Sequence, residues 1–427
     1  MSVAQNNLTG SISYEDLYRR WENSSWSAME IDLSADVDGW AALSDLQRRS
    51  ALWIYSMFFY GEDSVTDNLS PFIDAAPREE QKYFLATQQA DEARHAVFFH
   101  RFFKEVIGVG DDIASTLATT TPQLNWGYMK VFDRLDRMAD ELRADRSLPK
   151  FAQAITLYHL VVEGTLAQPG QHYIEDFFMR DGSLPGFSAG MENISRDEQR
   201  HIGFGVKVLS ELLADAEQGD ECKAAVDEIL GEVMQYTSSI FIPPGWDREY
   251  TRCYGFELED IAEFGMRSIE AKWKAIGYPM SEMAPGVIPM DFSIPARERG
   301  ARLLKLVHAG VVGEPGLPAD SSPDSQELYF DLISRSVDPT AANGSPFTIQ
   351  WQFSDAAPWH LVVDNGSTRA VSGNAPSADV TMKSSWQDFI ELGKGAISAP
   401  RAISRRKLKL SGGIRSLITL RKLLPDP

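Results

Sequence analysis

The chain has 427 residues, 43% of them hydrophobic and 24% charged, a composition typical of a globular protein with about two to three domains. Its net charge of −20 argues against general nucleic-acid binding. No apolar run reaches the roughly 18 residues of a membrane-spanning helix. With no signal-peptide pattern, and with Cys222 and Cys253 too few for a disulfide framework, we expect a cytoplasmic protein without a transmembrane segment.

Apolar residues recur at helical spacing from about residue 39 to residue 278. This pattern predicts a mainly α region in which long helices with short connections form a bundle. The expected helices cover 40–69, 78–106, 127–145, 150–178, 187–216, 220–240 and 257–276.

The character of the sequence changes after residue 308. A stretch rich in Gly, Pro, Ser and Asp predicts a linker. We therefore expect a helical domain of residues 1–308, a linker of residues 309–325 and a small α+β domain of residues 326–427.

Alternating apolar and polar residues predict strands in this last part of the chain. The expected strands cover 347–353, 359–366, 368–373 and 378–383. The dipeptide Asn365-Gly366 predicts a hairpin turn. A short helix is expected over 385–395, with Ser384 or Ser385 as its N-cap.

The C-terminal tail is basic. Residues 401–422 contain eight Lys or Arg and no Asp or Glu. Such a segment suits an anionic lipid or another acidic ligand. A solvated face, with the basic bias of helix C-termini, explains it equally well.

Two Glu-x-x-His pairs occur in apolar helical settings. Glu92 precedes His95 by three residues, and Glu198 precedes His201 by three, so each pair shares one helix face. Each pair lies one helix downstream of a carboxylate that interrupts an apolar run, Glu62 in the first case and Glu163 in the second. Two Glu helices combined with two Glu-x-x-His helices are the pattern of the dimetal carboxylate site in ferritin-like bundles.

The physical reason for this pattern is charge balance. Four buried carboxylates would repel one another and take up protons, whereas two divalent cations would neutralise them. Carboxylate and imidazole ligands suit iron and manganese. The competing interpretation places these residues on exposed helix faces.

The segments "GEDSVTDNLSPF", "QADEARHAVFF", "LYHLVVEGTLA" and "DEQRHIGFG" resemble the ribonucleotide reductase small-subunit superfamily, in particular its R2-like ligand-binding oxidase branch. The resemblance implies manganese at Glu62, Glu92 and His95, and iron at Glu163, Glu198 and His201. It also implies a bound long-chain fatty acid and a homodimer.

Phe99 stands where the reductases carry a radical-forming Tyr, so no such radical is expected. The oxidase branch forms an ether cross-link between a Val and a Tyr, and the resemblance places these at Val65 and Tyr158. Ordinary core packing is the alternative for both residues. His159 and His172 are interpreted as structural or as supports of the metal ligands, and Asp91 and Asp197 are expected to be exposed.

The C-terminal region resembles a sterol carrier protein type 2 lipid-binding domain, on the segments "FTIQWQF", "WHLVVDNG" and "SADVTMKSSWQDFIELGKG". The resemblance implies a lipid tunnel, and an ordinary core is the alternative. The candidate lining residues are Trp351, Phe353, Trp386, Phe389, Ile390 and Leu392.

The resulting hypothesis is a dioxygen-activating oxidase with manganese and iron, or with two irons, that acts on a fatty acid or other lipid-like substrate. An electron-donor protein is a further candidate partner. The alternatives are a di-iron oxygenase of an amine or hydrocarbon, and a non-enzymatic lipid carrier with a vestigial metal site. A reductase radical subunit is disfavoured by Phe99.

Overall fold

The structure is a computed structural model, and it describes residues 12–364 and 366–424. The chain divides into two compact units: Met1–Leu230 with Ile240–Met280, and Gly231–Ser239 with Ser281–Pro427. The domain limits expected from the sequence, at 308 and 325, stay a prediction. Within the described residues, no helix combines the length and the apolar character needed to cross a membrane.

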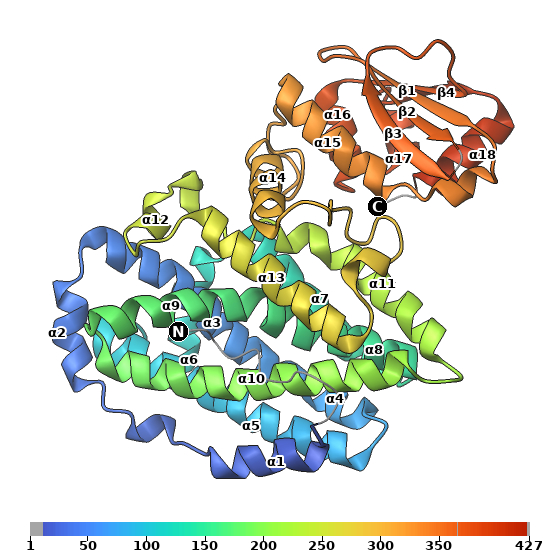
Figure 1. Ribbon diagram of the computed structural model, residues 1–427. Helices are drawn as coiled ribbons and strands as arrows, with labels where there is room; N and C mark the ends of the chain where they lie inside the picture. The colour runs from blue at the N-terminus through green and yellow to red at the C-terminus, as the bar shows by residue number, and fades with distance from the viewer. Residues whose placement is uncertain (1–11, 365, 425–427) are drawn as a thin grey trace. The chain divides into compact units, whose positions relative to one another are not determined.

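The first unit is helical, with its long helices packed side by side (Figure 1). Up to residue 282 the helices are α1 (Tyr14–Asn23), η1 (Ala28–Glu30), α2 (Ser34–Ala42), α3 (Asp45–Asn68), α4 (Ser70–Ala75), α5 (Glu79–Phe102), η2 (Phe103–Ile107), α6 (Ile113–Thr120), η3 (Thr121–Gln123), α7 (Trp126–Ala144), α8 (Leu148–Ile155), η4 (Thr156–Ala167), α9 (Gln168–Asp181), α10 (Pro185–Leu213), α11 (Gly219–Thr237), η5 (Pro244–Trp246), α12 (Glu249–Arg252), α13 (Leu258–Ile276) and η6 (Met280–Glu282).

Local signals explain where these helices begin. Ser44 caps α3 by accepting a hydrogen bond from the amide of Gln47, whose side chain bonds back to Ser44. This capping box divides the single helix expected over 40–69 into α2 and α3. An aromatic core then holds α3, α5 and α10 together, because Phe58, Phe98 and Phe187 are buried in one cluster.

The helix expected over 150–178 differs from the structure in its middle. There the chain widens into the π-helix η4 (Thr156–Ala167), with α8 before it and α9 after it. Apolar periodicity does not reveal such a change, because the segment is buried on nearly every side. The π-helix contains Tyr158 and Glu163, two of the candidate site residues.

The second unit combines helices with one sheet. Its further elements are α14 (Ala296–His308), α15 (Pro323–Ser336), η7 (Pro339–Ala342), β1 (Phe347–Phe353), β2 (Trp359–Asp364), β3 (Ser367–Ser372), β4 (Val380–Ser384), α16 (Trp386–Gly393), α17 (Ala399–Ser404), β5 (Lys409–Gly412) and α18 (Ile414–Leu423). Over residues 347–412 the strand order is β3-β2-β1-β4-β5, with β1 parallel to β4 and the other neighbours antiparallel.

The predicted strands and the hairpin of β2 and β3 are confirmed, although Asn365 lies outside the described residues. Ser385 is the N-cap of α16 and accepts from the amide of Asp388. The short strand β5 was not expected. The fold class is therefore a mainly helical ferritin-like bundle followed by a small α+β domain.

The six apolar residues considered for a lipid tunnel belong to the core of the second unit. Trp351, Trp386, Phe389 and Ile390 are buried there, and Phe353 and Leu392 pack against them. Phe330 of α15 lies at the centre, stacked on Trp359 with ring centroids 4.7 Å apart and edge-on to Trp351 at 5.3 Å.

Replacing Phe330 by Ala should lower the free energy of unfolding of the second unit by about 3–5 kcal/mol, because the ring is fully buried. Urea unfolding followed by tryptophan fluorescence measures the change. The control is Ile403→Ala, since Ile403 is 45% exposed, and it should change stability by less than about 0.5 kcal/mol. Equal effects of the two variants would contradict this account of the core.

Candidate metal centre

Four helical segments bring the six sequence-predicted ligands together in the first unit. Glu62 comes from α3, Glu92 and His95 from α5, Glu163 from η4, and Glu198 and His201 from α10. Each Glu-x-x-His pair points inward because residues three apart share a helix face.

His95 faces three carboxylates. Its Nδ1 atom lies 3.2 Å from Glu62 Oε2, 3.2 Å from Glu92 Oε2 and 3.5 Å from Glu198 Oε1. In this group of four residues the ligand atoms all lie within 4.8 Å of one another, close enough for a single ion to bind.

His201 faces a second set of carboxylates. Its Nδ1 atom lies 3.1 Å from Glu92 Oε1, 3.6 Å from Glu163 Oε1 and 3.8 Å from Glu198 Oε2. The two imidazole centroids are 6.2 Å apart. Glu92 and Glu198 thus each offer one oxygen to either histidine, which suits two metal ions that share ligands.

The cluster is almost fully withdrawn from solvent. The four carboxylates are at most 6% exposed and both histidines are 0% exposed. Burial raises the pKa of Glu62, Glu163 and Glu198. Burial opposes ionisation of Glu92 as well, but His201 and His95 hold its pKa well below the usual range. A positive charge among these buried carboxylates would therefore stabilise their ionised forms.

Asp91 and Asp197 are buried, which corrects the expectation that they face solvent. Asp197 of α10 lies 3.2 Å from Nε2 of His95 on α5, and Asp91 of α5 lies 3.2 Å from Nε2 of His201 on α10. A carboxylate only accepts hydrogen bonds, so each Nε2 donates and each Nδ1 turns toward the cluster. One helix therefore orients the histidine of the other.

Two arginines and two tryptophans hold these aspartates in place. Arg200 bonds to Asp91 at 2.5 Å and to Asp197 at 3.0 Å. Arg94 bonds to Asp91 at 2.8 Å. The indole N–H groups complete the network, Trp21 donating to Asp91 at 2.9 Å and Trp26 to Asp197 at 2.8 Å. The network repeats because the sequence repeats Asp-Glu-x-Arg-His at 91–95 and 197–201.

Gln88 connects the π-helix to the cluster. Its Nε2 atom donates to Glu163 Oε1 at 2.6 Å and to the hydroxyl oxygen of Tyr158 at 3.1 Å. Tyr158 in turn donates to Glu92 Oε1 at 2.6 Å, and burial raises the pKa of its phenol so that it keeps its proton. His159 Nε2 lies 3.0 Å from Gln88 Oε1. Burial lowers the pKa of His159 to about 3, so its imidazole is neutral.

The wide turns of η4 explain why Tyr158 and Glu163 meet. They are five residues apart, which in an α-helix would separate them by about 140° around the axis. Hydrogen bonds from i to i+5 bring such residues back to the same face.

Buried Lys272 of α13 supports the segment, donating at 3.0 Å to the carbonyl of Gly164, 2.6 Å to Gln168 Oε1 and 2.6 Å to Ser268 Oγ. His172 stacks on Phe264, with ring centroids 4.3 Å apart.

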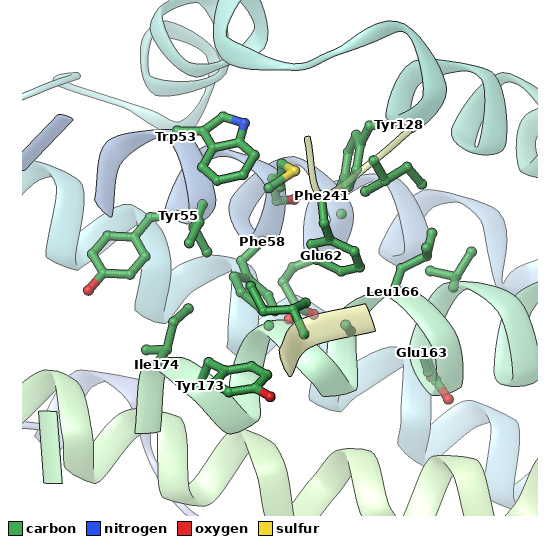
Figure 2. Close-up of a pocket in the computed structure, with 18 of the residues that line it drawn as sticks. Trp53, Tyr55, Phe58, Glu62, Tyr128, Glu163, Leu166, Tyr173, Ile174 and Phe241 are labelled. Carbon is green, nitrogen blue, oxygen red and sulfur yellow. Dashed lines mark hydrogen bonds between the residues drawn. The ribbon is translucent and has the colours of Figure 1, made fainter. Parts of the chain in front are cut away.

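An apolar pocket opens beside the carboxylates (Figure 2). Figure 2 shows the rings of Trp53, Phe58, Tyr173 and Phe241 around it, with Glu62 and Glu163 among the lining residues. Val65 and Tyr158 also line it.

Phe99 is fully buried next to this wall, where it stacks on Phe58 with centroids 5.8 Å apart. The position that would carry a radical-forming phenol is therefore occupied by a ring that packs in the core.

Two family comparisons cover most of the chain. The model of the ribonucleotide reductase small chain matches residues 12–241. The model of the alkyl sulfatase C-terminal domain matches residues 324–427. The second match corrects the sterol carrier assignment, which was wrong. Alternating strands and a buried aromatic core indicate a small α+β domain, but many families share that pattern.

Solved structures resemble the first part of the chain. An R2-like ligand-binding oxidase from Sulfolobus acidocaldarius has 25% identity and a TM-score of 0.52, over 65% of this chain and 93% of that one. A variant R2-like ligand-binding oxidase with an anaerobically reconstituted Mn/Fe cofactor has 25% identity and a TM-score of 0.54, over 62% and 93%. A variant with an aerobically reconstituted Mn/Fe cofactor, at 23% identity and a TM-score of 0.53 over the same shares, shows the fold.

The crossed aspartates should tune metal binding. Replacing Asp91 or Asp197 by Asn should weaken affinity for divalent metal by about 10–100-fold. The neutral amide would hold the imidazole less firmly than the carboxylate does, and the imidazole would be a less basic ligand. Competition with a chelating dye measures the affinity. Asp140→Asn, on an exposed part of α7, is the control and should leave it unchanged. An unchanged affinity in both aspartate variants would contradict the orienting role.

Proposed function

Because the chain belongs to the ribonucleotide reductase small-chain family, we propose that it is a dioxygen-activating dimetal oxidase of the R2-like ligand-binding kind. The observation that carries this proposal is the pair of overlapping ligand groups, joined by Glu92, next to an apolar pocket. A protein that only stored or carried lipid would not need four buried carboxylates at the end of such a pocket.

The residues of the cluster fit two metal ions. Among the buried polar atoms of the described residues that have no hydrogen-bond partner are Glu163 Oε2, Glu198 Oε2 and His201 Nδ1; the others lie outside the six predicted ligands. Burying a polar atom without a partner costs free energy. All three atoms belong to the cluster, and metal coordination would satisfy them. The donor set is oxygen and nitrogen only, which suits manganese and iron.

We assign manganese to Glu62, Glu92 and His95, and iron to Glu163, Glu198 and His201. The support for the metal pair is that similar solved structures carry a Mn/Fe cofactor. The metals would supply the redox chemistry that activates dioxygen. Glu92 and Glu198 each have one oxygen near either histidine, so we also propose that the two ions would share both carboxylates.

The protein supplies orientation and a dry environment. Asp91 and Asp197 hold the histidines, and Gln88 holds Glu163. Tyr158 keeps a proton on its phenol and donates it to Glu92 in a hydrogen bond. The aromatic wall of the pocket excludes water, which strengthens electrostatic interactions in the site and protects a reactive centre from side reactions.

The pocket supports a lipid-like substrate such as a long-chain fatty acid. Its lining is aliphatic and aromatic along most of its length, and its acidic groups gather at the metal cluster. A carboxylate headgroup could bind the metals while the chain occupies the apolar part. A homodimer, an electron-donor protein and a cytoplasmic location stay predictions.

The cross-link between Val65 and Tyr158 is part of the proposal. Val65 is buried, and both residues line the pocket beside the cluster. An ether would form between a side-chain carbon of Val65 and the phenolic oxygen of Tyr158. A C–H and an O–H bond break, and two electrons and two protons pass to dioxygen.

Elemental analysis of the full chain, expressed with manganese and iron both present, should give about one of each metal per chain if two unlike ions are bound. His95→Ala should lose metal, and His100→Ala, on the same helix but bonded to Thr116, should keep it. Two irons per chain would favour a di-iron oxygenase of an amine or hydrocarbon. No metal in the unmodified chain would favour the lipid carrier with a vestigial site and overturn the oxidase.

Mass spectrometry of peptides should detect the cross-link as one joined peptide that is lighter by two hydrogen atoms, formed in air and absent under nitrogen. Val65→Ala and Tyr158→Phe should abolish it while metal binding persists. Tyr128→Phe is the control, because Tyr128 also lines the pocket but donates to the carbonyl of Met57. A joined peptide in the Tyr158→Phe variant would show that the wrong phenol was assigned.

A further inference from the structure

The basic tail forms an exposed surface that the oxidase site does not use. Residues 401–422 carry eight Lys or Arg and no acid, and each of these cations is exposed in the structure. They lie on α17, β5, α18 and the segments between them. Among the described residues, Lys407 is the one cation of this segment with an acidic partner, Asp388 at 2.7 Å.

Helix α18 presents apolar residues on two faces. Leu420 and Leu423 point inward and are 7% and 1% exposed. Ile414 and Ile418, one turn apart, are 80% and 56% exposed. Helical spacing places Arg421, one turn after Ile418, on the same outward face, so the exposed isoleucines have charged neighbours.

Arg415 and Lys422 lie beside this stripe, seven residues apart and therefore two turns from each other on one side of the helix. Ile403, at the end of α17, is a third exposed isoleucine of the segment and is 45% exposed. We call Ile414, Ile418, Arg415, Arg421 and Lys422 the basic isoleucine face.

We propose that the basic isoleucine face docks the protein onto an anionic lipid surface. The isoleucines would enter the boundary between headgroups and acyl chains, and the cations would contact lipid phosphates. Exposed apolar side chains and cations on one helix both contribute to binding at a lipid–water interface. Since no helix of the described chain can cross a membrane, such docking would be peripheral.

Charge and shape favour lipid over other acidic partners. A nucleic acid would bind the cations through its phosphates. Those phosphates lie on the outside of the double helix and offer no apolar surface to the two exposed isoleucines. The chain as a whole carries −20, which opposes approach to any polyanion. Salt screens that field beyond about 8–10 Å. Close to the basic isoleucine face, the electrostatic potential is therefore set by the local cations and is positive.

Both components of the face should be needed. Each Lys or Arg near an anionic membrane contributes roughly a fivefold factor in binding, and a weak apolar anchor is stable only together with such a charge cluster. This proposal does not depend on the proposed oxidase activity, because none of its residues belongs to the metal cluster or the pocket.

Sedimentation of the full chain with vesicles tests the proposal. Vesicles of phosphatidylcholine mixed with phosphatidylglycerol should bind the protein, vesicles of phosphatidylcholine alone should bind at least tenfold less, and binding should fall with salt. Ile414→Ser with Ile418→Ser should weaken binding about tenfold or more, and so should Arg415→Glu with Lys422→Glu.

Matched controls distinguish an effect of the basic isoleucine face from an effect of net charge or of any exposed apolar residue. Arg20→Glu with Lys305→Glu changes the net charge equally at exposed positions elsewhere, and Met29→Ser removes a 69% exposed apolar residue from the first unit. Both controls should bind as the unmodified chain does, and circular dichroism should show that all variants are folded.

Three results would overturn the proposal. The first is no binding of the unmodified chain to anionic vesicles at low salt. The second is equal binding to neutral vesicles. The third is binding that needs the cations but is unaffected by the isoleucine substitutions, which would assign the face to polyanions in general.

Discussion

The first unit depends on the burial of four carboxylates and two imidazoles in one place. Their charges cannot be left without partners in an apolar core, and every neighbouring element contributes to that balance. Glu92 and Glu198 extend one oxygen to each histidine, and Asp91 and Asp197 bind the far side of each ring. Helices α5 and α10 are therefore joined by polar contacts where most bundles use only apolar ones.

This dependence explains the less regular parts of the fold. On a regular α-helix, residues five apart such as Tyr158 and Glu163 would point in different directions. The π-helix η4 lets Tyr158 and Glu163 reach the cluster together, and Lys272 satisfies a carbonyl of that segment. π-Helical turns are rare and are frequently found at functional sites. Here the same segment also forms part of the pocket wall, since Val162 and Leu166 line it.

Sequence could predict what depends on spacing within one helix. The two Glu-x-x-His pairs, and the carboxylates that interrupt apolar runs, were visible because residues three apart must share a face. Asp91 and Asp197 were misjudged because their partners lie on the other helix, which a single helix pattern does not show; the repeat of Asp-Glu-x-Arg-His was the signal that could have revealed them. β5 was missed because Lys409–Gly412 is too short to alternate clearly. The family of the second domain was misassigned because a strand pattern identifies an architecture more readily than a family.

The near symmetry of the cluster limits where a difference between two metals can arise. His95 and His201 have equivalent partners: each has an aspartate on Nε2, a tryptophan and arginines behind that aspartate, and the shared Glu92 and Glu198 in front. The remaining carboxylates are not equivalent. Glu62 comes from a regular helix and bonds to His95, whereas Glu163 comes from the π-helix and is held by Gln88. Tyr158 also adds a donor to the oxygen of Glu92 that faces His201. If the protein distinguishes manganese from iron, the available differences are Glu62 against Glu163, the groups around η4, and the rings beside the histidines, since Trp26 stacks on His95 whereas Phe84 lies edge-on to His201.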